Sequence, residues 1–206
     1  MAPLVVGFDL DMTLVDSRPG IAATLVALQA ETGAPVAGDD MLDALLRRNL
    51  DLEFGERFDA ADAVRWADRF RELYVEHGVP CTEPLPGARG ALDAVHEAGG
   101  RAVVVTAKYE PNARRCLDQV GLAVGVHVDA VFGWRYADGK ADTLLDEGAA
   151  VYVGDTPNDV RAARRARAHM VGVTTGPHPA AELRAAGATT VLESLLPFPR
   201  WLADHA

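Results

Sequence analysis

The chain has 206 residues, of which 49% are hydrophobic and 24% are charged, and its formal net charge is -10. This length can bury a full core, and it suits one domain with an inserted subdomain better than two large domains. The acidic balance without a basic cluster excludes an obvious nucleic-acid partner. No stretch of about 18 apolar residues occurs, which excludes a membrane-spanning helix.

The N-terminus and the cysteines indicate a cytoplasmic protein. No basic region precedes the first short apolar run, so the sequence predicts no signal peptide. Cys81 and Cys116 are too few for a disulfide framework, which favours reduced thiols in the cytosol. Nothing in the sequence predicts an oligomeric state.

The first predicted strand is an apolar run, Leu4 to Phe8, that leads directly into Asp9 and Asp11. In open α/β sheets, ligands bind at the carboxyl ends of the strands. Two carboxylates this close repel each other, and burying both unpaired is costly. A metal ion, a role in phosphoryl transfer, or both would account for them.

Residues 16–83 are predicted to form an all-helical insertion. Apolar residues share one helical face between residues 21 and 28, and again between 63 and 77. Asp59 is a plausible N-cap for the second of these helices. The breaker cluster at 82–87 predicts a hinge back to the rest of the chain. The aromatic side chains of this insertion are expected in its core: Phe54, Phe58, Trp66, Phe70 and Tyr74.

Strands and helices alternate after residue 87. The expected strands lie at 101–106, 130–132, 150–153, 170–173 and 189–191, and the expected helices at 111–120, 141–147 and 157 to about 166. Near-continuous apolar strands alternating with helices predict an α/β fold, with a parallel sheet covered on both faces. The predicted division is a core of residues 1–15 and 84–206, interrupted by the helical insertion.

Chemistry-bearing residues recur at the ends of these strands or just after them. They are Asp9 and Asp11 after the first strand, Thr106 at the end of 101–106, Lys140 after Gly139, and Asp155 and Asp159 after 150–153. In a parallel sheet these ends lie along one edge, so residues far apart in sequence can converge there.

The residue types suit phosphoryl transfer. Asp9 can act as a nucleophile and form an aspartyl-phosphate. Asp11 can protonate the leaving oxygen and then activate water. The hydroxyl of Thr106 can donate to a phosphoryl oxygen, and Lys140 can neutralise charge that develops in the transition state.

The remaining acids predict a metal site. Mg2+ is a hard cation that is held by a few carboxylates together with waters and substrate phosphate. Asp155 and Asp159 supply carboxylates next to Asp9 and Asp11. The metal would also suppress repulsion between these acids and the incoming phosphate.

Four ordered motifs of this chain resemble those of the haloacid dehalogenase-like hydrolases. They are Asp9-Leu10-Asp11-Met12-Thr13-Leu14, the strand-ending Thr106, Lys140, and Gly154-Asp155-x-x-x-Asp159. The segments 106–108, 111–122 and 84–88 are similar to the phosphoglycolate phosphatase branch. The resemblance covers nearly the whole chain, including the helical insertion after the first motif.

The resemblance implies a Mg2+-dependent phosphatase with a helical cap, residues 16–83, over a Rossmann-like core. The implied substrate is a small phosphorylated metabolite, phosphoglycolate or a sugar phosphate. The implied Mg2+ ligands are Asp9, the backbone carbonyl of Asp11, and Asp155, while Asp159 supports the metal shell or pairs with Lys140. Thr106 and the amide of Ala107 are implied to hold the phosphoryl group.

Two residues differ from the family pattern, and two basic residues could contact the substrate; all four affect which substrate is expected. Met12 stands where the family often has Gly, and Ala107 stands where this branch often has Asn. Lys108 is expected either to touch a substrate anion or to form a salt bridge with Glu110. Arg47, in the insertion, is a candidate for the non-reacting end of the substrate.

Other functions on the same scaffold stay open. A phosphosugar mutase of the β-phosphoglucomutase type shares the core motifs, and a non-catalytic phospholigand-binding protein would use the same fold. A dehalogenase is disfavoured because Asp11 is present. A phosphonate hydrolase of the Schiff-base type is disfavoured because it needs an amine in the cap, and residues 16–83 contain no lysine.

Overall fold

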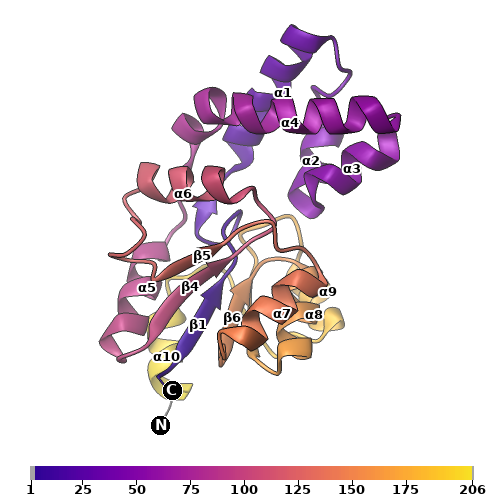
Figure 1. Cartoon of the computed structure of the whole chain (residues 1–206). Coiled ribbons are helices and arrows are strands. Elements are labelled where there is room, and N and C mark those ends of the chain that lie inside the picture. Colours follow the sequence, from indigo (N-terminus) through magenta and orange to yellow (C-terminus); the bar gives the residue numbers. More distant parts are fainter. Residues whose placement is uncertain (1–2, 206) are drawn as a thin grey trace.

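The sheet determines where the predicted strand ends meet. The computed structural model describes residues 3–205, and its six-stranded sheet has the order β5-β4-β1-β6-β7-β8 (Figure 1). Every neighbouring pair is parallel, which confirms the predicted α/β class. The strands are β1 (Val5–Phe8), β4 (Arg101–Val105), β5 (Ala130–Phe132), β6 (Val151–Gly154), β7 (His169–Val173) and β8 (Thr190–Leu192).

The strand register aligns the carboxyl ends of the central strands. Phe8 of β1 lies opposite Val104 of β4 and Val153 of β6. Because these neighbours run in the same direction, the residues that follow them emerge side by side at one edge of the sheet.

Helices cover both faces of the sheet and bury its apolar strands. Val6 and Phe8 lie in a cluster with α5 (Ala88–Glu97), α6 (Glu110–Gln119) and α10 (Phe198–His205). Val5 points to the other face, where α7 (Asp138–Asp146), α8 (Pro157–Ala166) and α9 (Ala180–Ala186) pack. Burial on both faces explains why the strands are nearly continuous apolar runs instead of alternating ones.

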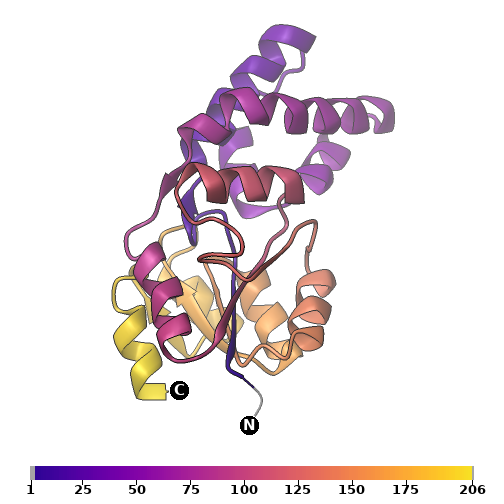
Figure 2. The ribbon, with the colours of Figure 1, turned by 60° about the vertical axis from the view of Figure 1, so that its left-hand side comes forward.

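The helical insertion lies beyond the carboxyl end of the sheet, as Figures 1 and 2 show. It consists of α1 (Arg18–Thr32), α2 (Asp39–Arg47), α3 (Leu50–Arg57), α4 (Ala60–His77) and the 3-10 helix η1 (Val79–Cys81). None of the helices within residues 3–205 combines the length and the apolar character that crossing a bilayer requires.

A short antiparallel pair joins the insertion to the sheet. β2 (Val15–Asp16) enters it and β3 (Glu83–Pro84) leaves it, with Val15 opposite Pro84. The sequence predicted no strand between residues 16 and 83, and these two strands lie at the ends of that range. Two residues are too few to produce an alternating pattern that sequence could reveal.

Local chemistry explains the start of the longest helix and the packing around it. The Asp59 carboxylate accepts hydrogen bonds from the amides of Ala61 and Asp62, both at 3.1 Å, which confirms the predicted N-cap. The Phe58 ring packs edge-on against Trp66, with centroids 4.8 Å apart. Four of the five predicted aromatic residues are buried in the insertion and Phe58 is partly buried against them, although Phe70 and Tyr74 also line a cavity.

Candidate active site

Three buried carboxylates meet at the carboxyl edge of the sheet. Asp9 follows β1, Asp155 follows β6, and Asp159 lies in the first turn of α8. One oxygen from each carboxylate lies within 4.8 Å of the others. The structure therefore brings together acids that are up to 150 residues apart in sequence.

Lys140, in the first turn of α7, supplies a positive charge to this cluster. Its Nζ lies 3.0 Å from Asp9 Oδ2 and 2.6 Å from Asp159 Oδ1, and the residue is only 3% exposed. Burial alone would lower the pKa of Lys140, but the two carboxylates outweigh burial and raise it. The side chain is therefore an ammonium group at neutral pH.

The three carboxylates differ in how well their oxygens are satisfied. Asp159 accepts from Lys140 and also from the amide and hydroxyl of Thr156, at 3.0 and 2.7 Å. Asp9 Oδ1 and Asp155 Oδ2, by contrast, have no hydrogen-bond partner among residues 3–205. Buried acceptors without partners are costly, so these two oxygens are the ones that suit a cation.

The electrostatics of the cluster point the same way. Burial, together with the charges of Asp159 and Asp11, raises the pKa of Asp9 to about 6, although Lys140 acts in the opposite direction. Burial, followed by the charges of Asp159 and Asp9, raises the pKa of Asp155 well above its ordinary value. Carboxylate oxygens are the ligands of hard divalent cations, so the residues present can hold such an ion.

Several residues around Asp155 were assigned no role from the sequence. Thr13 Oγ1 donates to Asp155 Oδ1 at 3.1 Å. A Cβ atom on Gly176 would lie 1.9 Å from Asp155 Oδ2, so only glycine fits there. Thr175 Oγ1 donates to the carbonyl of Met12 at 2.5 Å. Thr175 and Gly176 follow β7, so the strand-end rule that identified Asp9 could also have identified this loop.

Met12 adopts a backbone conformation that is unusual for its side chain. Its φ is +59°, in the left-handed region that glycine tolerates and other residues rarely adopt. The Met12 side chain is buried at 5% exposure. The turn after Asp11 therefore forms without the glycine that the family often has there.

A cavity of about 80 Å3, here called the acid cavity, lies over the carboxylate cluster. Thr106 and Ala107 line it from the sheet edge, and the Thr106 hydroxyl accepts from the amide of Lys108 at 3.2 Å. Arg47 lines it from the insertion and donates to the carbonyl of Pro177 at 3.0 Å, so the insertion contacts the core here. Its lining residues are Asp9, Asp11, Leu45, Leu46, Arg47, Arg48, Asn49, Thr106, Ala107, Tyr136, Lys140, Asp155, Thr156 and Asn158.

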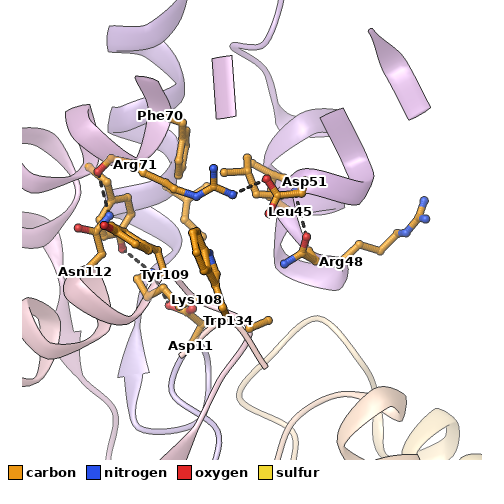
Figure 3. Close-up of a pocket in the computed structure, with 15 residues that line it drawn as sticks. Asp11, Leu45, Arg48, Asp51, Phe70, Arg71, Lys108, Tyr109, Asn112 and Trp134 are labelled. Carbon is orange, nitrogen blue, oxygen red and sulfur yellow. Dashed lines mark hydrogen bonds and ion pairs between the residues drawn. The ribbon is translucent and has the colours of Figure 1, made fainter. Parts of the chain in front are cut away.

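A second cavity of about 110 Å3, here called the aromatic cavity, is shown in Figure 3. Both cavities are lined by Asp11, Leu45, Arg48, Asn49 and Ala107, so they lie next to each other between insertion and core. The rest of the aromatic cavity is lined by Ile21, Leu50, Asp51, Phe70, Arg71, Tyr74, Lys108, Tyr109, Asn112 and Trp134.

Lys108 lies between these two parts of the protein. Its Nζ donates to Asp11 Oδ1 at 2.8 Å and to the Tyr74 hydroxyl at 3.0 Å. The alternative of a salt bridge with Glu110 is wrong, because Glu110 accepts from Arg114 instead. Lys108 therefore connects α4 of the insertion to the second acid of the first motif.

Comparisons with known proteins agree with this geometry. The family model described as haloacid dehalogenase-like hydrolase matches residues 6–173. A phosphoglycolate phosphatase from Caulobacter vibrioides is 31% identical to the chain, over 95% of the chain and 89% of that protein. A phosphoglycolate phosphatase from Rhodospirillum rubrum is also 31% identical, over 97% of the chain and 91% of that protein.

A solved structure shows the same fold. The crystal structure of a predicted phosphatase from Clostridium acetobutylicum superposes with a TM-score of 0.84 and covers 99% of this chain and 100% of its own. Its sequence identity of 22% supports the fold alone. Family model, relatives and fold agree: the chain belongs to the haloacid dehalogenase-like hydrolases, and it is an enzyme of their phosphoglycolate phosphatase-like branch.

Proposed function

We propose that this protein is a Mg2+-dependent phosphatase that hydrolyses a small phosphorylated metabolite through an aspartyl-phosphate on Asp9. The observation that carries the proposal is the position of Asp9, buried beside Lys140 and Asp155 at the floor of the acid cavity. The acid cavity offers a carboxylate nucleophile, an ammonium group and a hydroxyl donor within one small space.

The metal proposal concerns the two carboxylates with free oxygens. Asp9 and Asp155 would hold the ion, together with the backbone carbonyl of Asp11, while Asp159 keeps Lys140 and the start of α8 in position. A bound Mg2+ would neutralise the carboxylates and draw substrate phosphate oxygens toward them.

The proposed reaction proceeds in two steps. A carboxylate oxygen of Asp9 attacks phosphorus, the bond to the ester oxygen breaks, and Asp11 gives its proton to the departing alkoxide. Asp11 then accepts a proton from water, which attacks the acyl-phosphate and releases inorganic phosphate with Asp9 restored. Lys140 offsets charge on the phosphoryl oxygens, and Thr106 and the amide of Ala107 donate to them.

We assign residues 16–83 as a cap and residues 1–15 and 84–206 as the catalytic core, of which residues 1, 2 and 206 lie outside the described part of the chain. Arg47, from the insertion, lines the acid cavity, which supports this division. Lys108 donates to the hydroxyl of Tyr74 in the cap and to the carboxylate of Asp11 in the core. Movement of the cap would therefore affect the hydrogen bonding of Asp11. A closed cap excludes water during the first step and must open to release the product.

Phosphoglycolate and sugar phosphates are the candidate substrates, and phosphoglycolate is the one in the names of the curated relatives. Arg47 and Lys108 are the basic residues proposed near the substrate. Lys108 would affect the substrate through Asp11, because its Nζ donates to the Asp11 carboxylate. The two free thiols, Cys81 and Cys116, support a cytoplasmic location.

The test is phosphate release from a panel of phosphorylated metabolites, with and without Mg2+. Asp9→Asn keeps the shape of the side chain and removes the nucleophile, so turnover should fall by at least about a thousandfold. Asp118→Asn changes an exposed acid of α6 and serves as the matched control. Full turnover in Asp9→Asn would refute the nucleophile, and isomerisation of a hexose phosphate without phosphate release would favour the mutase.

A further inference from the structure

The aromatic cavity shares part of its lining with the acid cavity. Its wall is formed by Phe70 and Tyr74 from α4 and by Tyr109 and Trp134 from the core (Figure 3). Because Ala107 and Asp11 line both cavities, the aromatic cavity is the neighbouring space on the insertion side of the site where an ester would present its phosphorus to Asp9.

The cations that line this cavity are already paired. Lys108 is bound to Asp11 at 2.8 Å, as described above. Arg71 pairs with Asp51 and, at 2.9 Å, with Asp68.

The third cation, Arg48, is held in the same way. It pairs with Glu56 at 2.7 Å and with Glu53 at 3.3 Å. Among the described residues that line the cavity, no cation is free to receive a second anion. A leaving group that carries a carboxylate would have to compete with these acids or enter unpaired. Displacing Asp11 from the largely buried Lys108 or entering unpaired is unfavourable, whereas competing with the exposed Glu56 for Arg48 costs less.

Trp134 is the most unusual residue of this wall. It is 57% exposed, which is high for the largest apolar side chain, and its φ of +53° lies in the left-handed region. Its amide donates to the carbonyl of Lys108, and the amide of Arg135 donates to the carbonyl of Thr106, both at 2.9 Å. Two backbone hydrogen bonds therefore hold an exposed indole in a strained conformation at the cavity.

Tyr109 and Arg71 lie close to the Trp134 indole and enlarge this wall of the cavity. The ring of Tyr109 lies 5.1 Å from it, centroid to centroid, at an interplanar angle of 41°. The guanidinium of Arg71 lies 5.5 Å from the indole centroid. Rigid aromatic faces next to a planar cation favour a planar partner over a bulky saturated one.

We propose that the aromatic cavity binds the leaving group of the substrate, and that this group is an uncharged alcohol carrying a planar ring. The proposal rests on the phosphatase function and narrows its substrate class. It favours the phosphate ester of an aromatic or heteroaromatic alcohol over phosphoglycolate, whose leaving group is an anion.

The test compares four phosphates at saturating Mg2+. Benzyl phosphate and cyclohexylmethyl phosphate differ in the planarity of a six-membered ring, phosphoglycolate adds a charge, and acetyl phosphate reports phosphatase chemistry without a ring. We expect kcat/KM for benzyl phosphate to exceed that for cyclohexylmethyl phosphate by about two- to tenfold. It should exceed that for phosphoglycolate by more than about tenfold.

A variant and its control then connect this preference to the cavity. Trp134→Ala should reduce the ratio of benzyl to cyclohexylmethyl turnover to about one, while Leu196→Ala should leave the ratio unchanged. Leu196 is a suitable control because it is 66% exposed and lies between β8 and α10, outside both cavities.

The outcomes separate this proposal from the phosphatase function. Hydrolysis of acetyl phosphate with phosphoglycolate preferred to benzyl phosphate would overturn the leaving-group proposal and leave the phosphatase standing. An unchanged ratio in Trp134→Ala would overturn it in the same way. No hydrolysis of any of the four would overturn the leaving-group proposal, while the metabolite panel described above decides the phosphatase function separately.

Discussion

The buried charge of Asp9 should make the metal-free protein less stable as the pH rises. Its pKa is raised from 3.8 to about 6 in the folded protein. One pKa unit corresponds to about 1.4 kcal/mol, so the ionised carboxylate costs about 3 kcal/mol in the fold. This is a large share of a typical free energy of unfolding of about 5–15 kcal/mol.

The direction follows from proton linkage. A carboxyl group with a raised folded-state pKa binds its proton more tightly when folded, so its favourable contribution is present below pH 3.8. That contribution is lost as the pH rises through about 6. Asp9→Asn cannot ionise at this position. The free energy of unfolding of Asp9→Asn minus that of the wild type should therefore increase by about 2–3 kcal/mol from pH 4 to pH 7. The raised pKa of Asp155, caused in part by Asp9, adds an effect of the same sign.

Urea unfolding in EDTA at several pH values measures this difference. The contributions of carboxylates that titrate alike in both proteins cancel when the two free energies of unfolding are subtracted. Asp118→Asn, an exposed acid of α6, should differ from the wild type by a constant amount over the same range. Adding Mg2+ at pH 7 should stabilise the wild type more than Asp9→Asn, since an ion that binds only the folded state shifts the equilibrium toward it. A wild-type to Asp9→Asn difference that stays flat with pH would refute the electrostatic reasoning.

Three further substitutions test other parts of the site. Met12→Gly should lower the free energy of unfolding by up to about 4 kcal/mol in urea titrations. Relief of left-handed strain gains about 1–2 kcal/mol, and loss of a buried methionine costs about 2–5 kcal/mol. A stabilised variant would contradict this. Lys108→Met should free the carboxylate that Lys108 holds, so kcat should fall more for alkyl phosphates than for 4-nitrophenyl phosphate, which needs little help from an acid; equal losses would indicate a merely structural lysine. Gly176→Ala should displace Asp155 and weaken Mg2+ binding, measured by the Mg2+ dependence of turnover, by at least about tenfold. Gly55→Ala, in α3 where the added methyl meets nothing within 4 Å, should leave Mg2+ dependence unchanged, and equal behaviour of the two variants would refute the steric argument.

The convergence of the acids could be predicted because it depends on a general property of parallel sheets. Apolar runs identified β1 and β6, and the carboxyl ends of parallel strands lie along one edge of a sheet, so Asp9 and Asp155 could be expected to converge; the structure makes the two strands neighbours. The position of Lys140 followed in the same way from the start of α7.

The partners of individual side chains could not be predicted in this way. Lys108 was expected near substrate or Glu110, two residues away, but its acceptors are 97 and 34 residues distant. The distance between α4 and the loop after β4 depends on how the insertion packs, which no local periodicity encodes. The fit of Gly176 against Asp155 is hidden for the same reason, since a single glycine gives no signal of what lies opposite it.

The pairing of β2 with β3 has a consequence for the history of such enzymes. Val15 and Pro84 are neighbours across this pair, although 68 residues separate them. The whole helical segment thus leaves and rejoins the chain at almost one point, so its removal would open a gap that a tight hairpin turn can bridge. A segment attached in this manner can be lengthened, shortened or replaced without changing the order of the strands in the sheet. New specificities can then arise in the exchanged part while the reaction chemistry is inherited intact.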